Sequence, residues 1–185
     1  SNSNTRTIQL GTGTWTLLNG TLSSTIFTWD TTTTSNLTFT ISTSVISIFS
    51  ATQVTTFTFH GGGLTFYDVT FGGHNNNQAT IFESNTFHTL TVDDVWGTMK
   101  FEAGKTQTCT TLDANGSPSH NVIFNSAANG SETSISAGTA TVSYLTVRDN
   151  HALGVAVPFN DCPGGRDDGG NTDWIFCSGK NLMYY

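Results

Sequence analysis

The sequence predicts an all-β fold, a single-domain β-solenoid or parallel β-helix with irregular coils of about 20 residues and a C-terminal cap. The first observation is a repeat: Thr65–Phe71 has Thr, apolar, Val or Leu, Thr and apolar residues at positions that recur in Thr86–Val92 and Thr141–Val147. The second is polar and apolar alternation, clearest in Leu37–Ile41, which is typical of strands with one buried face. The third is that helical periodicity is missing.

Short strands are expected from the start of the chain. Gly11-Thr12-Gly13 separates the first two, and Asn19-Gly20 is a tight-turn signal. The Gly61–Phe71 stretch predicts a strand, a small step and a second strand. The expected strands up to this point are Thr5–Leu10, Thr14–Leu18, Thr25–Trp29, Leu37–Ile41, Val45–Phe49, Val54–Phe59 and Leu64–Phe71.

Three later strands each end in Phe, namely Thr80–Phe82, Met99–Phe101 and Val122–Phe124. Like residues at like places in successive coils fill a solenoid core, so we expect these Phe side chains to stack. Only Ala152–Val157 suggests a helical turn. Residues 1–160 are expected to form the coils, and residues 161–185 a Gly- and Asp-rich cap and tail of the same domain.

Composition limits the class of protein. The chain has 185 residues, of which 36% are hydrophobic and 10% charged, which fits one folded domain with a polar uncharged surface. A net charge of -7 argues against a nucleic-acid partner, because the phosphate backbone repels an acidic surface. The longest apolar runs fall short of the roughly 18 residues of a membrane span.

The cysteines suggest one disulfide. Cys162 and Cys177 lie 15 residues apart in the Gly-rich terminal region, and a bond between them would contribute about 3 kcal/mol by the loop-entropy estimate. The alternative is two buried free thiols. Cys109 lies in an alternating segment and is expected to be a small core residue and not a nucleophile.

A Gly-rich acidic segment near the C-terminus is a candidate calcium site, since calcium prefers oxygen ligands. The alternative is a solvated acidic turn, because the closing bidentate Glu of a calcium loop is missing. The candidate ligands are Asp161, Asp167, Asp168, Asn171 and Asp173. The five histidines, at positions 60, 74, 88, 120 and 151, do not share metal-ligand spacing on one element, and we expect them in turns or, for His88, on an outward strand face.

No catalytic residue is predicted. Polysaccharide hydrolysis needs a pair of carboxyl groups, for which the repeat region offers Glu83, Glu102 and the neighbours Asp93 and Asp94. The neighbouring pair is expected in a solvent-facing turn. The nucleophile motif Gly-x-Ser-x-Gly does not occur.

Two kinds of binding surface remain as alternatives. Tyr67, Trp96 and Tyr144 are expected to be exposed aromatics on which sugar rings could stack. Ranks of Thr on a flat face could bind ice, provided that Thr pairs recur at one place in successive coils. In the sequence the Thr-x-Thr triplets drift, for example Thr12–Thr16, Thr38–Thr40 and Thr139–Thr141, which disfavours that function.

Several stretches together resemble the Thr/Gly-rich β-solenoid proteins of bacteriophages and environmental bacteria. They are Gly11–Leu17, Gly61–Phe71, Ser84–Val92, Phe101–Thr108, Val142–Ala152 and Gly169–Phe176. The resemblance implies a surface-exposed structural part of a virion or cell envelope. It supplies no catalytic residues.

The leading expectation is therefore a non-enzymatic structural protein of an extracellular assembly, above all a capsid decoration or spike component at a virion surface. The apolar ending Met183-Tyr184-Tyr185 is expected to contact a neighbouring chain in a homo-oligomer, with a trimer favoured. The alternatives are a cell-surface adhesin or carbohydrate-binding module, a polysaccharide hydrolase and an ice-binding protein.

Overall fold

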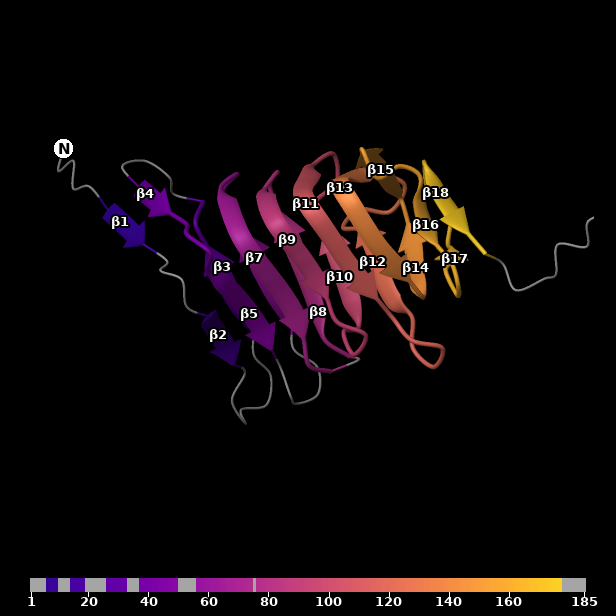
Figure 1. Ribbon diagram of the computed structural model, residues 1–185, viewed down its shortest axis with the longest axis horizontal. Coiled ribbons are helices and arrows are strands. Elements are labelled where there is room, and N and C mark those ends of the chain that lie inside the picture. Colours follow the sequence, from indigo (N-terminus) through magenta and orange to yellow (C-terminus); the bar gives the residue numbers. More distant parts are fainter. Residues whose placement is uncertain are drawn as a thin grey trace, which may run out of the picture.

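The protein is built from parallel strands. A computed structural model describes residues 6–9, 14–18, 26–32, 37–49, 56–74 and 76–177, and every regular element in these ranges is a strand (Figure 1). The helical turn suggested at 152–157 is wrong, since a strand occupies its first half and a non-helical turn the next residues. Among the described residues there is no helix of the length and hydropathy that crossing a membrane would require.

Two seven-stranded sheets make up most of the fold. Neighbouring strands in both sheets are parallel, and the chain passes from the first sheet to the second and back as it advances (Figure 1). The first sheet contains β2 (Thr14–Leu18), β5 (Val45–Phe49), β7 (Thr65–Gly72), β9 (Thr86–Val92), β11 (Thr106–Asn115), β13 (Thr133–Ser143) and β15 (Asn150–Gly154). The second contains β3 (Ile26–Asp30), β6 (Thr56–His60), β8 (Gln78–Phe82), β10 (Thr98–Phe101), β12 (Val122–Ser126), β14 (Leu145–Arg148) and β17 (Arg166–Asp167). This arrangement is consistent with a β-solenoid.

Two small sheets flank these, each of two parallel strands. Near the N-terminus β1 (Arg6–Gln9) pairs with β4 (Leu37–Thr40), and near the C-terminus β16 (Phe159–Asp161) pairs with β18 (Trp174–Phe176). The predicted strands are therefore present at nearly the expected places. The Gly11–Gly13 and Asn19-Gly20 turns lie outside the described residues.

Two of the three predicted repeats stack in register. Thr65 pairs with Thr86 and Phe71 with Val92, so the first copy lies directly beside the second. The third copy does not lie beside them. The chain bends at Tyr144, whose φ is 53°, so that the copy belongs partly to β13 and partly to β14. The segment beside Thr86–Val92 is instead Thr108–Ala114. The prediction was wrong for Thr141–Val147 because Val142 and Leu145 turn inward on either side of a bend.

The step predicted within the first repeat is a change of facing inside one continuous strand, β7, and the prediction of two separate strands was wrong. Phe66 and Val69 are buried, whereas the two residues between them, Tyr67 and Asp68, are only partly covered. The same pair of outward residues recurs as His88-Thr89 in β9 and Thr110-Thr111 in β11. Each long strand therefore bends and contributes inward side chains on both sides of the bend.

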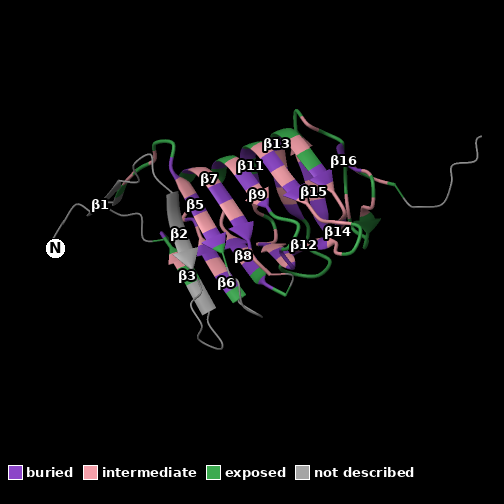
Figure 2. Cartoon of the chain, turned by 60° about the horizontal axis from the view of Figure 1, so that its bottom comes forward, coloured by how far each residue is buried: buried purple, intermediate pink, exposed green. Residues whose placement is uncertain are grey.

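Buried positions alternate with less buried ones along the strands (Figure 2). The core that they form lies between the sheets and is rich in aromatic rings. Phe66 is in contact with Phe59 and Phe87, with ring centroids 5.0 Å and 5.8 Å apart. Of the three Phe residues expected to stack, Phe101 and Phe124 are in contact, but their rings meet edge to face at 5.4 Å, and Phe124 pairs with Met99 in the sheet, so the predicted stacking at like positions was wrong. Phe82 does not join them, because it lies outside the core and stacks on His60 at 4.3 Å.

A disulfide links the C-terminal ends of β16 and β18. Cys162 and Cys177 are bonded, with their Cα atoms 5.2 Å apart, and they directly follow the paired residues Asp161 and Phe176. The bond thus fastens β18 to β16. The predicted interface residues Met183, Tyr184 and Tyr185 lie outside the described residues.

Candidate functional site

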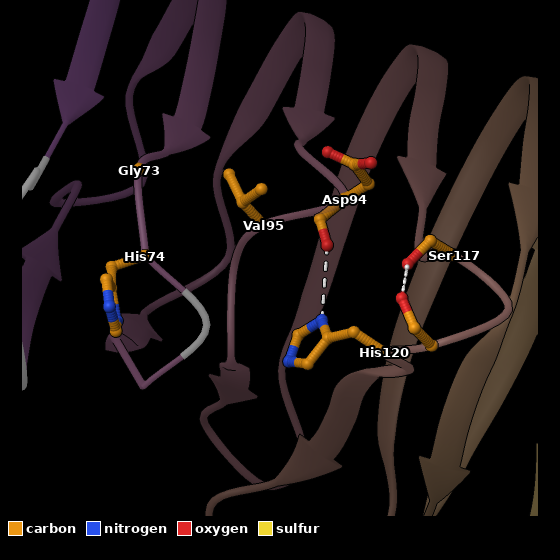
Figure 3. A pocket seen from close by; sticks show the side chains of 7 residues that line it. Gly73, His74, Asp94, Val95, Ser117 and His120 are labelled. Carbon is orange, nitrogen blue, oxygen red and sulfur yellow. Dashed lines mark hydrogen bonds between the residues drawn. The ribbon is translucent and has the colours of Figure 1, made fainter.

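A corner of the first sheet carries two hollows, of about 420 Å³ and 360 Å³. The larger is lined by turns that follow β7, β9 and β11 (Figure 3), the smaller mainly by the last residues of the same three strands, and the two share Asp94. The larger hollow is bounded by Gly73-His74 on one side, Asp94-Val95 in the middle and the 117–120 turn on the other side. Three successive coils therefore contribute to one surface depression.

The 117–120 turn is rigidly built. Ser117 and His120 exchange two backbone hydrogen bonds, of 2.8 Å and 3.0 Å, so Pro118-Ser119 forms a tight loop. The preceding residue must be Gly116, because a Cβ there would meet the Tyr144 carbonyl oxygen at 2.4 Å. The hydroxyls of Ser117 and Ser119 are 3.3 Å apart at the edge of the hollow.

The two imidazoles of this hollow have different hydrogen-bonding roles. His120 Nδ1 lies 3.1 Å from the backbone oxygen of Asp94, and because a carbonyl only accepts, Nδ1 carries the hydrogen and Nε2 of the neutral ring is an acceptor. His74 Nδ1 accepts from the backbone N–H of Asn76 at 3.3 Å, which leaves the hydrogen of the neutral ring on Nε2. One ring thus offers an acceptor and the other a donor.

The smaller hollow is acidic. Asp93, Asp94 and Asp113 all line it. Burial raises the pKa of Asp93, and a hydrogen bond with Asp94 adds to the effect. Asn115 donates to Asp113 at 2.5 Å and accepts from Ser143 at 2.9 Å, which fixes the orientation of the Asp113 carboxylate.

Of the carboxyl groups considered for hydrolysis, Glu83 and Glu102 lie at a different corner from Asp93 and Asp94. Asp93 and Asp94 occupy a turn, as expected. Glu102 accepts from the backbone N–H of Glu83 at 2.7 Å, and Glu83 contacts His60 at 2.9 Å and the backbone N–H of Gly62 at 3.3 Å. Glu83 and Glu102 therefore connect coils to one another and do not join the acidic hollow.

The five predicted calcium ligands do not converge on one point, although Asp167 and Asn171 hydrogen-bond to each other. Asp161 is buried and accepts from the Leu145 N–H at 3.1 Å, and burial raises its pKa to about 7. Asp167 accepts from Gly169 and Asn171, Asp168 contacts Arg166, and Asp173 contacts His151. In the part of the chain that the structure describes, no group of three or more His, Cys, Asp or Glu residues could hold a metal ion.

The three aromatic residues considered for sugar stacking are largely covered. Trp96 is 1% exposed and donates its indole N–H to the Thr98 carbonyl, so the expectation that it is exposed was wrong. His88, which is outward-facing as expected, stacks on Tyr67 at 4.2 Å. Gly164 packs so closely on Tyr144 that a Cβ would lie 2.0 Å from the ring.

Sequence reasoning missed the larger hollow. His74 lies 43 or more residues before Ser117, Ser119 and His120 in the sequence, so the four residues do not form a sequence motif. Only the stacking of the coils brings them to one hollow. The available signal was positional, since each group directly follows a strand of the first sheet. No family model, curated protein or solved structure matches the chain.

Proposed function

We propose that the chain is a non-enzymatic structural protein of an extracellular assembly, in the form of a bacteriophage capsid decoration or spike component. The observation that supports this most is the strand ladder, in which each inward residue lies beside its counterpart in the next coil. Such stacking gives a stiff scaffold whose outer residues are free to vary. The resemblance to Thr/Gly-rich phage solenoids favours the same role.

The C-terminal end of the ladder suits a contact with another chain. On β18, Ile175 is 44% exposed, and the half-buried Trp174 and Phe176 stack on each other at 6.0 Å. A strand at the end of a sheet carries backbone groups that can pair with a partner. The apolar residues Met183, Tyr184 and Tyr185 follow soon after in the sequence, and a symmetric trimer would cover all of them.

The disulfide supports an extracellular setting. Bonds such as Cys162–Cys177 persist in oxidising surroundings and are rare where thiols are kept reduced. A virion surface or cell exterior is therefore the proposed location.

Light scattering tests the assembly. We expect the full chain to be a trimer, and both a version ending at Lys180 and Ile175→Lys to be monomers. Val155→Lys is the matched control, because Val155 is 89% exposed in the turn after β15, a strand that does not pair with β18, and it should remain a trimer. A monomeric full chain would contradict the proposal.

A second candidate function, ice binding, is favoured by the register of the Thr residues. Thr65, Thr86 and Thr108 are all exposed and form one row across three strands, and Thr89, Thr111 and Thr139 form another. The spacing of the Thr residues varies along the sequence, but turns of different length compensate for this variation. The Thr residues therefore still align in these rows. Neighbouring hydroxyls spaced about 4.8 Å apart across a sheet can order water.

Inhibition of ice recrystallisation tests this second function. Thr111→Lys would place a charge in the middle of the second row and should abolish inhibition. Thr80→Lys is the matched control, since Thr80 is an equally half-buried outward residue on β8 of the other sheet. Wild-type protein without inhibition would exclude the function.

A further inference from the structure

We propose that the larger hollow, between His74 and the 117–120 turn, binds a neutral sugar unit of a glycan. This goes beyond a structural role, because a scaffold requires no ligand. The hollow of about 420 Å³ lies within the range of small-molecule sites. It is assembled from three coils and exists only in the folded ladder (Figure 3).

The hydrogen-bonding groups of the hollow match hydroxyls. A sugar hydroxyl both donates and accepts, and the hollow offers both partners: an acceptor at His120 Nε2 and a donor at His74 Nε2, as fixed by the bonds of their Nδ1 atoms. The Ser117 and Ser119 hydroxyls can serve in either role. Adjacent hydroxyls on one ring could therefore be satisfied at once.

Charge favours a neutral ligand over an anionic one. Asp94 lines the hollow, two further carboxyl groups lie in the adjoining hollow, and the chain carries a net charge of -7. A phosphate, sulfate or carboxylate would be repelled there. A divalent cation is disfavoured by the geometry, because the described residues contain no cluster that could hold a metal ion.

An apolar surface completes the site. Val95 is 41% exposed and lies between the two histidines in the wall of the hollow (Figure 3). Sugar rings have apolar C–H faces as well as hydroxyls, and most ligand sites combine apolar walls with a few placed polar groups. The sugar would thus bind without the aromatic platforms of Tyr67, Trp96 or Tyr144.

The site is also preorganised. The paired backbone bonds of Ser117 and His120, and the close packing of Gly116 on Tyr144, hold one wall. A fixed wall reduces the ordering cost of binding. The whole connection between β11 and β12, residues 116–121, is longer than the corresponding 93–97 segment after β9, and it carries Ser119, a residue of the hollow.

The test is an NMR titration of isotope-labelled full-length protein that follows the backbone amides and the two imidazoles. The probes are maltotetraose, cellotetraose, a tetramer of N-acetylglucosamine and a tetramer of galactose, with sialyllactose as the anionic comparison. We expect at least one neutral probe to shift the signals of His74, Val95 and His120 together, and sialyllactose to bind more weakly than that probe.

Variants locate the binding. His74→Leu and Ser119→Ala should each weaken binding about fivefold, the effect of losing one hydrogen bond, while their spectra remain those of the folded protein. His88→Leu is the matched control, because it removes a half-exposed imidazole on another face, and it should bind as wild type does. The proposal is overturned if none of the neutral probes shifts these signals, or if His74→Leu and His88→Leu bind equally well.

This result is independent of the proposed assembly. A monomer that binds sugar would retain the site and exclude the structural trimer. A trimer in which no neutral probe binds to the hollow would exclude the sugar site and remain consistent with the structural role.

Discussion

Gln107 hydrogen-bonds to Asn85 of the preceding coil, and both side chains are fully buried. The Gln107 side-chain oxygen accepts from the Asn85 backbone N–H at 3.3 Å and from its amide at 3.1 Å, while its nitrogen donates to the Glu83 carbonyl at 2.6 Å. Asn85 in turn accepts from the Gly63 N–H at 3.2 Å. Three coils are thus linked by one buried polar ladder, which fixes their register beside the apolar core.

Gln107→Leu should lower the free energy of unfolding by about 2–4 kcal/mol, because it leaves two Asn85 donors and the Glu83 carbonyl buried without this partner. Urea unfolding followed by circular dichroism gives the value. Thr108→Ala, at the exposed neighbouring position on β11, should change it by less than about 0.5 kcal/mol. Equal effects of the two substitutions would contradict the assigned role of the ladder.

Replacing both Cys162 and Cys177 by Ser should lower stability by about 3 kcal/mol, as expected for opening a loop of this length. The loss should be concentrated in β16 and β18, which the bond fastens together, and hydrogen exchange should therefore accelerate there first. A reducing agent should have the same effect on the wild type. Uniform acceleration across all strands would contradict a local role.

Cys109 should resist alkylation in the native protein. Burial raises the pKa of its thiol to about 12, and its Sγ donates to the Ser136 carbonyl at 3.6 Å, so almost no reactive thiolate is present near neutral pH. Iodoacetamide should modify this residue in denaturant and leave it intact in buffer. Mass spectrometry of both samples provides the comparison, and rapid labelling in buffer would show that the thiol is accessible.

Asp161 should make the protein less stable as the pH rises. Its folded-state pKa is raised to about 7, above the ordinary value, so the native state holds a proton that the unfolded state releases. The stabilisation is complete below about pH 4 and is lost as the pH rises to about 7, a change of about 2–4 kcal/mol.

Asp161→Asn should flatten this dependence, since an amide can still accept from Leu145 and has no proton to lose. Asp168→Asn, at an exposed position, should leave the slope unchanged. Urea unfolding at several pH values between about 4 and 8 measures both. An unchanged slope in Asp161→Asn would exclude this carboxyl group as its source.

The strands could be predicted because their signal is local. Alternation of Thr with apolar residues identified the strand that contains Phe57 and Phe59, and both are buried. The stacking of Thr65 on Thr86 followed from one shared spacing. These features depend on neighbours in the sequence or on a fixed period.

The site could not be predicted in the same way, because it depends on how turns of unequal length meet. Thr141–Val147 has the composition of a repeat and yet lies around a corner, while the true counterpart Thr108–Ala114 replaces the last Val by Ala and the sixth Thr by Asp. Trp96 looked like a surface aromatic in a turn, but the turn folds its ring inward, where it contacts Phe71 at 5.4 Å. Neither outcome is encoded in a short sequence window.

The unequal turns also make this chain a natural carrier for foreign peptides. Cys109 pairs with Phe87 on one side and with Ala137 on the other, although more residues separate it from Ala137. The additional residues fall in the turns at 116–121 and 127–132, and the second of these is exposed throughout. An epitope or enzyme spliced into 127–132 would be displayed at the rim while the strand pairing beneath it stayed the same.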